Sequence, residues 1–338
     1  MTDVSSPPSL NTMPNLVIEK IMEKSDWKSV LTLRQVSQRL RHQVDISSAS
    51  SGLSSIWFHV YQNLILIDIR SKNLEARLTF TYNPEENLYS RNWNDKEEVL
   101  LETENIVDSA IADLELILRF QKSLSDGLII CFCPSVNPDT SSFSWALQNV
   151  LESKAQPLKA RKLQMICPLS SQVMAILPYL DPVSLKAITL TSNGSSDFCL
   201  NEIVKTEQWK NANYLNLECY DTVLPVDHIT HFPRLRIEGV TISAAGLNVL
   251  KIGYSKWTQF EEFYGWSVKI PDFEQLSTIW GAPLVSDETH YWWYFQLPSS
   301  MERVFMIFCD RDLLGCEVIM KWIQPNKVKK GAVIQDIQ

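Results

Sequence analysis

The segment MPNLVIEKIMEKSDWKSVLTLRQVSQRLRHQV, residues 13–44, spaces its apolar residues at helical intervals. Ile18, Ile21 and Met22 follow the i, i+3, i+4 steps of one helix face. Pro14 is tolerated in a first turn, because its missing N–H would be unpaired there anyway. A second stripe repeats at three- and four-residue steps, through Val30, Leu33, Val36, Leu40 and Val44. The pattern predicts two or three short helices that share an apolar face.

Size and charge limit the classes of function. The chain has 338 residues, enough for two domains or for one large domain with a small module. Residues 1–50 carry six Lys/Arg and five Asp/Glu, and the rest carries 25 and 34, a net charge of −9. An acidic body argues against nonspecific nucleic-acid binding, which needs Lys and Arg to neutralise phosphates. We therefore expect no nucleic-acid partner.

The cysteines and the lack of long apolar runs predict an intracellular protein. Seven Cys, an odd number spread over a long chain, fit reduced thiols better than a disulfide framework. No apolar run approaches the ~18 residues of a membrane-spanning helix. Residues 1–11 are polar and lack the pattern of a signal peptide, so we expect a disordered leader there. The expected location is the cytoplasm, the nucleus or both, with no membrane partner.

The hydrophobic period changes after a Ser-rich break at residues 46–55. Residues 56–93 alternate like a small antiparallel β-meander, and residues 103–124 return to a helical pattern. Short apolar strands then recur, mostly at the ~20–29 residue interval of leucine-rich-type repeats. They lie at 128–133, 163–167, 187–190, 214–219, 235–240 and 259–264. The predicted helices between them lie at 142–153, 170–180 and 243–252. The expected fold class is α+β or α/β, with an N-terminal trihelical module, a β-meander and an irregular leucine-rich-repeat-like solenoid.

Candidate catalytic and metal-binding residues lack the context that such chemistry needs. There is no Gly-rich nucleotide loop. Cys131-x-Cys133 places two thiols on one strand face, but no second pair lies at a zinc-finger distance. Asp227, His228 and His231 are close in sequence, but no nucleophile elbow accompanies them. We expect buried thiols and capping or surface histidines, and no catalytic residue, cofactor or metal.

The aromatic run HYWWYFQL, residues 290–297, fits either a partner-binding hot spot or the core. In a strand, Tyr291 and Trp293 would share one face, and Trp292 and Tyr294 the other. We expect at least one of these faces to be core.

Residues 13–45 resemble an F-box, the trihelical module that docks on the Skp-type adaptor of cullin-RING ubiquitin ligases. The resemblance rests on a Met-Pro start, a helix with spaced aliphatic residues, and a second helix that ends in Leu-x-x-Val-Ser before a basic helix. Ser25 stands where the family usually has Leu. The resemblance implies that the adaptor is bound by Met13, Pro14, Leu16, Val17, Ile21, Leu31, Leu33, Val36, Ser37 and Leu40.

The second half resembles the FTH domain that follows the F-box in a large nematode family, the F-box A proteins. The matching segments are ILPYLDPVSLKAITL (176–190), QWKNANYLNLE (208–218), LPVDHITHFPRLRI (224–237) and VTISAAGLNVLK (240–251). Residues 290–308 look like the C-terminal strands of that family. The expected divisions are a leader at 1–11, an F-box at 12–47, a linking β-rich segment at 48–102, an FTH domain at 103–325 and a flexible tail at 326–338.

A helical module of ~35 residues is smaller than the ~40 residues below which a chain usually needs disulfides, a metal or a partner chain to fold. Its apolar face is therefore expected to be an interface, the alternative being that it packs on the chain's own downstream domain. The resemblance implies a non-enzymatic substrate receptor that binds a Skp-type adaptor, through it cullin, and an unknown protein target on the FTH domain. One alternative is a non-degradative scaffold that bridges a regulatory protein, for example an RNA-binding one, to a complex. Another is a hydrolase that uses His228 or His231.

Overall fold

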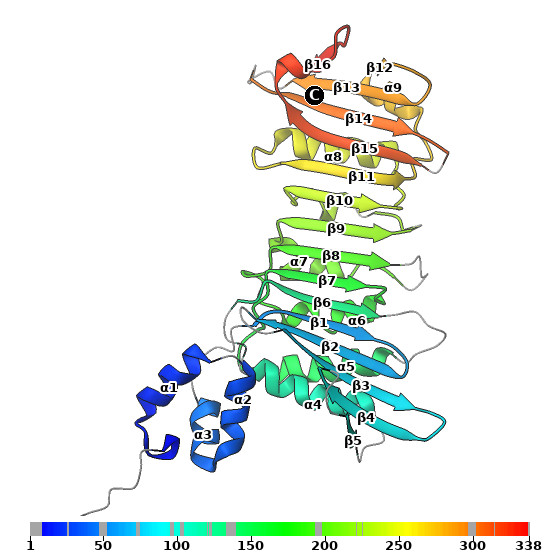
Figure 1. The fold of residues 1–338 in the computed structure, drawn as a ribbon. Coiled ribbons are helices and arrows are strands. Elements are labelled where there is room, and N and C mark those ends of the chain that lie inside the picture. The colour runs from blue at the N-terminus through cyan, green and yellow to red at the C-terminus, as the bar shows by residue number, and fades with distance from the viewer. Residues whose placement is uncertain are drawn as a thin grey trace, which may run out of the picture. The chain divides into compact units, whose positions relative to one another are not determined.

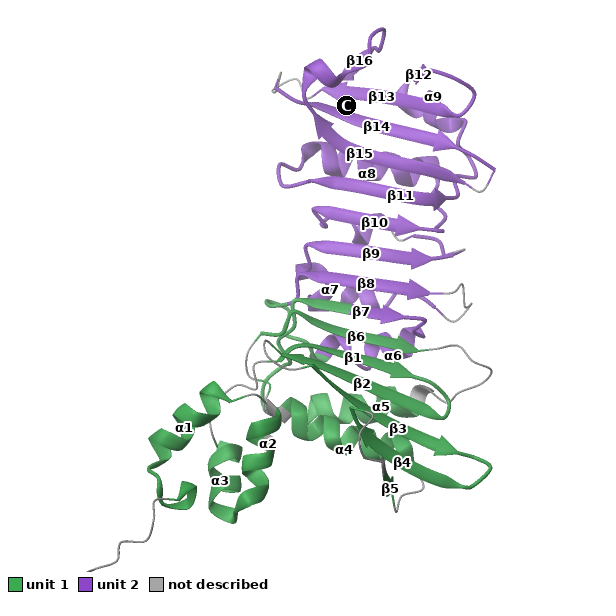
Figure 2. Ribbon diagram, viewed as in Figure 1, with its two compact units in different colours: residues 1–163, 179–184 green, residues 164–178, 185–338 purple. Residues whose placement is uncertain are grey.

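The computed structural model describes most of the chain, in two compact units. The described residues are 9–25, 27–46, 53–71, 75–94, 98–101, 105–119, 121, 124–132, 140–192, 198–220, 222–224, 226–296, 302–313 and 315–336. Unit 1 comprises residues 1–163 and 179–184, and unit 2 comprises residues 164–178 and 185–338 (Figure 2).

Unit 1 begins with a 3-10 turn, η1 (Leu10–Thr12), and three helices, α1 (Asn15–Lys24), α2 (Trp27–Val36) and α3 (Gln38–Ile46). The backbone N–H of Ser25 donates to the carbonyls of Ile21 and Met22, which ends α1. Ser37 separates α2 from α3, and its Oγ accepts the N–H of Leu40 at 3.2 Å, as an N-cap residue does. The segment that was predicted to be helical therefore forms three short helices, and the helix ends lie at Ser25 and Ser37.

The rest of unit 1 is a mixed sheet with helices on one face. Its strands are β1 (Leu53–Val60), β2 (Leu64–Ser71), β3 (Glu75–Asn83), β4 (Leu88–Trp93), β5 (Glu98–Leu101) and β6 (Gly127–Phe132). Strands β1 to β5 pair antiparallel in sequence order, and β6 pairs parallel with β1. Helices α4 (Ile106–Arg119) and α5 (Thr140–Glu152) lie behind the strands in Figure 1. Fully buried side chains such as Phe58, Phe80 and Leu114 form the core between the two layers.

Strand β7 (Lys162–Ile166) spans the boundary between the units, and unit 2 continues with parallel strands. These are β8 (Ala187–Ser192), β9 (Tyr214–Cys219), β10 (Arg234–Glu238) and β11 (Glu262–Val268). An antiparallel set follows, with β15 next to β11: β12 (Leu284–Val285), β13 (His290–Gln296), β14 (Val304–Arg311) and β15 (Cys316–Ile323). Strand β16 (Ile334–Asp336) pairs parallel with β13.

The helices of unit 2 also lie behind the strands in Figure 1. They are α6 (Ser170–Met174), α7 (Glu207–Asn211), α8 (Ala244–Lys256) and α9 (Gln275–Trp280), with 3-10 turns η2 (Leu177–Tyr179), η3 (Ile203–Lys205), η4 (Val226–His228) and η5 (Pro325–Lys327). Residues alternate along β9 and β10: Leu215, Leu217, Leu235 and Ile237 are buried, and their neighbours are partly or fully exposed. Unit 2 thus has a covered sheet face and an open one.

The fold class is α+β, with a large mixed sheet and helices. The strands expected from the apolar recurrence correspond to β6, β7, β8, β9, β10 and β11. The linking segment 48–102 and the segment after residue 103 are not separate in the structure, because β1 pairs with β6 in register from Ser55 to Val60. A strand pair of this kind places both segments in one compact unit.

Two expected terminal segments contain structure. Within the expected leader, residues 1–8 lie outside the described residues, and Asn11 accepts a hydrogen bond from the Ser37 hydroxyl at 2.6 Å. The expected tail contains the last two residues of η5 and all of β16, and Lys329 Nζ lies 3.1 Å from the ring centroid of Trp292. Both faces of β13 are core in part, because Trp293, Tyr294 and Phe295 are each 1% exposed.

None of the helices in the described part of the chain combines the length and the apolar composition needed to cross a bilayer.

Candidate functional site

The three N-terminal helices enclose a small apolar core of their own. Its members are Ile18, Met22, Val30, Leu40 and Val44, with Met13, Leu33 and Leu116 packed against it as partly buried neighbours. The three helices therefore hold each other in place through side chains that point inward. We name α1, α2 and α3 with this core the helical module.

Polar contacts fix the start of the chain onto α3. The Arg39 guanidinium donates to the carbonyl of Met13 at 2.7 Å, to Oδ1 of Asn15 at 3.0 Å and to the carbonyl of Asn11. A planar guanidinium has five donors in a rigid fork, so one side chain can hold several acceptors at once. Arg34 Nε pairs with Asp45 Oδ1 at 2.8 Å, which links α2 to α3. The Arg39 contacts position Met13 and Asn15, on either side of Pro14.

Several large aliphatic side chains of the module face outward. Leu16 is 68% exposed, Val17 is 41% exposed and Val36 is 59% exposed. Leu10 and Ile46, which the helical spacing of the sequence does not single out, are also exposed, at 38% and 60%. Scattered exposed apolar residues are ordinary, but a module of three helices with this many of them has a surface that a partner could cover.

The predicted adaptor-binding residues divide into three groups. Pro14, Leu16, Val17 and Val36 are exposed, whereas Met13, Ile21, Leu33 and Ser37 are half-buried. Leu40 is 0% exposed in the module's core, so its surface is available to a partner only if the module opens. The Leu31 backbone is part of α2, but its side chain lies outside the described residues.

The downstream part of unit 1 also touches the module. Leu116 of α4 packs against its core, and Lys28 Nζ lies 5.2 Å from the ring centroid of Trp93. Part of the apolar surface is thus covered by the chain itself, as the alternative reading requires. Leu16, Val17 and Val36 keep 41% or more of their surface exposed despite these contacts.

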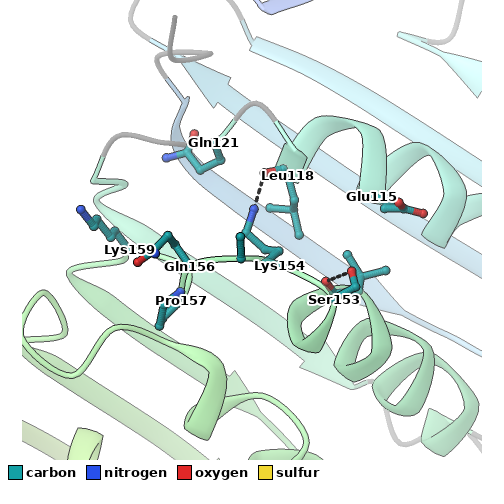
Figure 3. A pocket seen from close by; sticks show the side chains of 10 residues that line it. Glu115, Leu118, Gln121, Ser153, Lys154, Gln156, Pro157 and Lys159 are labelled. Atoms are coloured by element: carbon teal, nitrogen blue, oxygen red, sulfur yellow. Dashed lines mark hydrogen bonds between the residues drawn. The ribbon is translucent and has the colours of Figure 1, made fainter. Parts of the chain in front are cut away.

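A cavity of about 700 Å³ lies beside the C-terminal end of α4 (Figure 3). Lys154 Nζ reaches across it and donates to the carbonyl of Leu118 at 2.6 Å, where a cation complements the end of a helix. Its lining holds one carboxylate, Glu115, two lysines and neither Cys nor His. The Ser153 hydroxyl in this lining donates to the carbonyl of Val150 at 2.8 Å.

The structure places His228, His231 and Cys131, three of the residues that the sequence offered as candidates for chemistry. His231 Nε2 lies 2.9 Å from the carbonyl oxygen of Trp209, and Trp209 Nε1 donates to the carbonyl of His228 at 2.9 Å. Cys131 is half-buried in β6, and Cys133 lies outside the described residues. Among the described residues, no group of three or more His, Cys, Asp or Glu could hold a metal ion.

The environment of His231 makes a pH-dependent contribution to stability. Burial lowers the pKa of this imidazole below its ordinary value, so the folded state resists protonation. Folding free energy should therefore be lost as the pH falls below about 6.5, by at most about 1.4 kcal/mol per pH unit for one proton. A His231→Gln variant keeps a donor for Trp209 and removes this titration. Urea unfolding at several pH values between 7.5 and 5.5 should show a flatter pH dependence for the variant, and identical slopes would contradict the assignment.

Comparison with known proteins finds two similarities. The FTH domain family matches residues 141–277, which is narrower than the expected 103–325. The chain is also 29% identical over 68 residues to F-box A protein 224 of Caenorhabditis elegans, a stretch that covers 20% of this chain and 17% of that protein. No solved structure matches. The chain is thus similar to an FTH domain over residues 141–277 and, over a short stretch, to a nematode F-box A protein, of whose length it covers less than a fifth.

Proposed function

We propose that this chain is the substrate receptor of an SCF-type cullin-RING ubiquitin ligase. In this proposal the helical module docks on a Skp-type adaptor, and through it on cullin, while the FTH domain binds a target protein. The chain itself performs no chemistry and brings the target to the ligase.

The observation that carries the proposal is the exposure of Leu16, Val17 and Val36 beside a core that is already closed. Apolar surface of this kind gains about 25 cal/mol per Å² when a partner removes it from water. An amphipathic helix that lays such side chains in a groove is a common mode of protein recognition. Leu40 and the half-buried Leu33 serve the proposal indirectly, because they hold the exposed side chains in place.

Affinity purification of the tagged full-length chain, read by mass spectrometry, tests this function. The Val36→Asp variant should lose the adaptor and cullin and keep the proteins bound elsewhere on the chain. Val223→Asp is the matched control, because Val223 is 75% exposed and lies in unit 2. Leu33→Asp is a poorer choice, since Leu33 packs against the module's core and its substitution acts through folding. Adaptor recovery that is equal with Val36→Asp and with the wild-type chain would overturn the docking proposal.

Target turnover separates the receptor from the non-degradative scaffold. If the output is degradation, cells with the Val36→Asp chain should accumulate the captured target and lengthen its half-life. A target whose half-life is unchanged, while its binding to the wild-type chain persists, would indicate the scaffold instead.

A further inference from the structure

The open face of the sheet in unit 2 arranges its side chains in rows across the strands. The register pairs Glu218 of β9 with Glu238 of β10, and Glu238 with Trp266 of β11. Side chains at paired positions of parallel strands project from the same face, at the ~4.8 Å strand spacing. Gly265 pairs with Val318 and Val268 with Cys316, so Glu317 of β15 follows in the same row. We name Glu218, Glu238 and Glu317 the carboxylate row.

These carboxylates receive hydrogen bonds from neutral groups. Glu218 accepts from the Thr191 hydroxyl at 3.2 Å and from the Asn216 amide at 2.9 Å. Glu238 accepts from the Tyr220 hydroxyl at 3.0 Å, and Glu317 from the Tyr264 hydroxyl. Within the described residues, none of the three forms an ion pair.

The same face does contain cations, but they are engaged in other rows. Arg234 lies 5.6 Å from the ring centroid of Tyr214 and pairs with Glu261 at 3.2 Å. Arg236 lies 5.4 Å from the ring centroid of Tyr264. Neither of these two arginines forms an ion pair with the carboxylate row, and a directly opposed pair of like charges such as Glu218 and Glu238 destabilises a sheet.

Two exposed aromatic side chains complete the row. Trp266 is 45% exposed between Glu238 and Glu317, and Tyr220 is 47% exposed beside Glu238. Gly239 has a φ of 70°, and a Cβ there would lie 2.5 Å from Cδ1 of Tyr220, so the Tyr220 ring packs directly against the backbone. Indole and phenol faces attract cations, and Trp does so most strongly. Carboxylates that alternate with exposed rings suit the side chains of Arg and Lys.

We propose that the target of unit 2 is a protein with a basic segment, whose Arg or Lys side chains cross the strands along the carboxylate row and cover Trp266. The proposal rests on the substrate-receptor function, because it names the kind of protein that the FTH domain holds. A basic segment neutralises the opposed Glu218 and Glu238 on binding, whereas an acidic one would add to their repulsion. The net charge of −9 on residues 51–338 favours the same partner through long-range attraction.

A defined peptide probe tests the proposal on the full-length chain. The probe is a fluorescent peptide of repeated Arg-Gly-Ser, with a Glu-Gly-Ser peptide beside it, titrated by anisotropy at about 0.15 M salt. The Glu218→Gln/Glu238→Gln pair keeps the side-chain shape and the Tyr220 hydrogen bond while it removes two charges. Its affinity for the Arg peptide should fall about tenfold or more, and Trp266→Ala should weaken binding about fivefold, in line with the usual strength of such pairs.

The matched control is Glu202→Gln/Glu207→Gln, which makes the same charge change away from the row at carboxylates paired with Lys205 and Lys210. It should keep the wild-type affinity within about twofold. Equal losses in both double variants would show nonspecific attraction to an acidic chain and would overturn the proposal, as would tighter binding of the Glu peptide. Adaptor binding is measured on the same proteins. If the Arg peptide fails while the adaptor still binds, this inference alone is wrong, and if the adaptor fails while the Arg peptide binds at the row, the receptor function is wrong.

Discussion

The Leu16→Asp variant of the full-length chain should lose most of its affinity for a Skp-type adaptor while it stays folded. Leu16 is 68% exposed and lies in the first turn of α1. An acidic residue is favourable there, because the N-terminal end of a helix carries partial positive charge. In the proposed interface the same carboxylate would be buried without a partner, at a cost of about 3–5 kcal/mol. That cost corresponds to a loss of about two to four orders of magnitude in affinity.

Calorimetric titration with purified adaptor measures this loss, and circular dichroism checks that the helices remain. Leu313→Asp is the matched control, since Leu313 is fully exposed in unit 2 and the substitution adds the same charge. Its affinity should equal that of the wild-type chain. An unchanged affinity for Leu16→Asp would remove Leu16 from the interface.

The Leu40→Ala variant should unfold the helical module and leave the sheets of both units intact. Leu40 is 0% exposed in a core of five buried side chains. Truncation of a buried Leu to Ala costs about 2–5 kcal/mol, because a cavity remains where the side chain packed. A module this small has little free energy to lose.

Amide hydrogen exchange reports this result segment by segment. Protection should be lost in α1, α2 and α3 and retained in strands such as β2 and β9. The adaptor should bind weakly, and excess adaptor should restore part of the protection, since binding is linked to folding. A Leu40→Met variant of similar volume should keep both properties. Full protection of α3 in Leu40→Ala would contradict the role of Leu40 as a core residue.

The sequence predicted where most elements lie more readily than it predicted which residues are available to a partner. The stripe Val30, Leu33, Val36 and Leu40 looks continuous, but the break at Ser37 places Val36 at the end of α2 and Leu40 within α3. Each short helix orients its own residues, so Leu40 turns into the core while Val36 remains exposed. The helical spacing of the sequence could not reveal that Leu40 is buried while Val36 is exposed.

Long-range strand pairing accounts for the other features of the structure that the sequence did not predict. Alternation along residues 214–219 and 234–238 predicts which side chains share a face, because successive residues of a strand point to opposite sides. It does not predict that Glu218 lies opposite Glu238, which depends on the register. The parallel pairing of β1 with β6 likewise depends on residues about 70 positions apart, and it joined two segments that composition had separated.

Site-specific photo-crosslinking determines directly whether another protein covers the exposed side chains of the helical module. A benzophenone amino acid is placed at position 17 or 36 of the full-length chain, with position 223 as the control, and each protein is irradiated with purified Skp-type adaptor. We expect adaptor crosslinks from positions 17 and 36 and none from position 223. No crosslink from 17 and 36, or equal crosslinking from all three positions, would contradict this expectation.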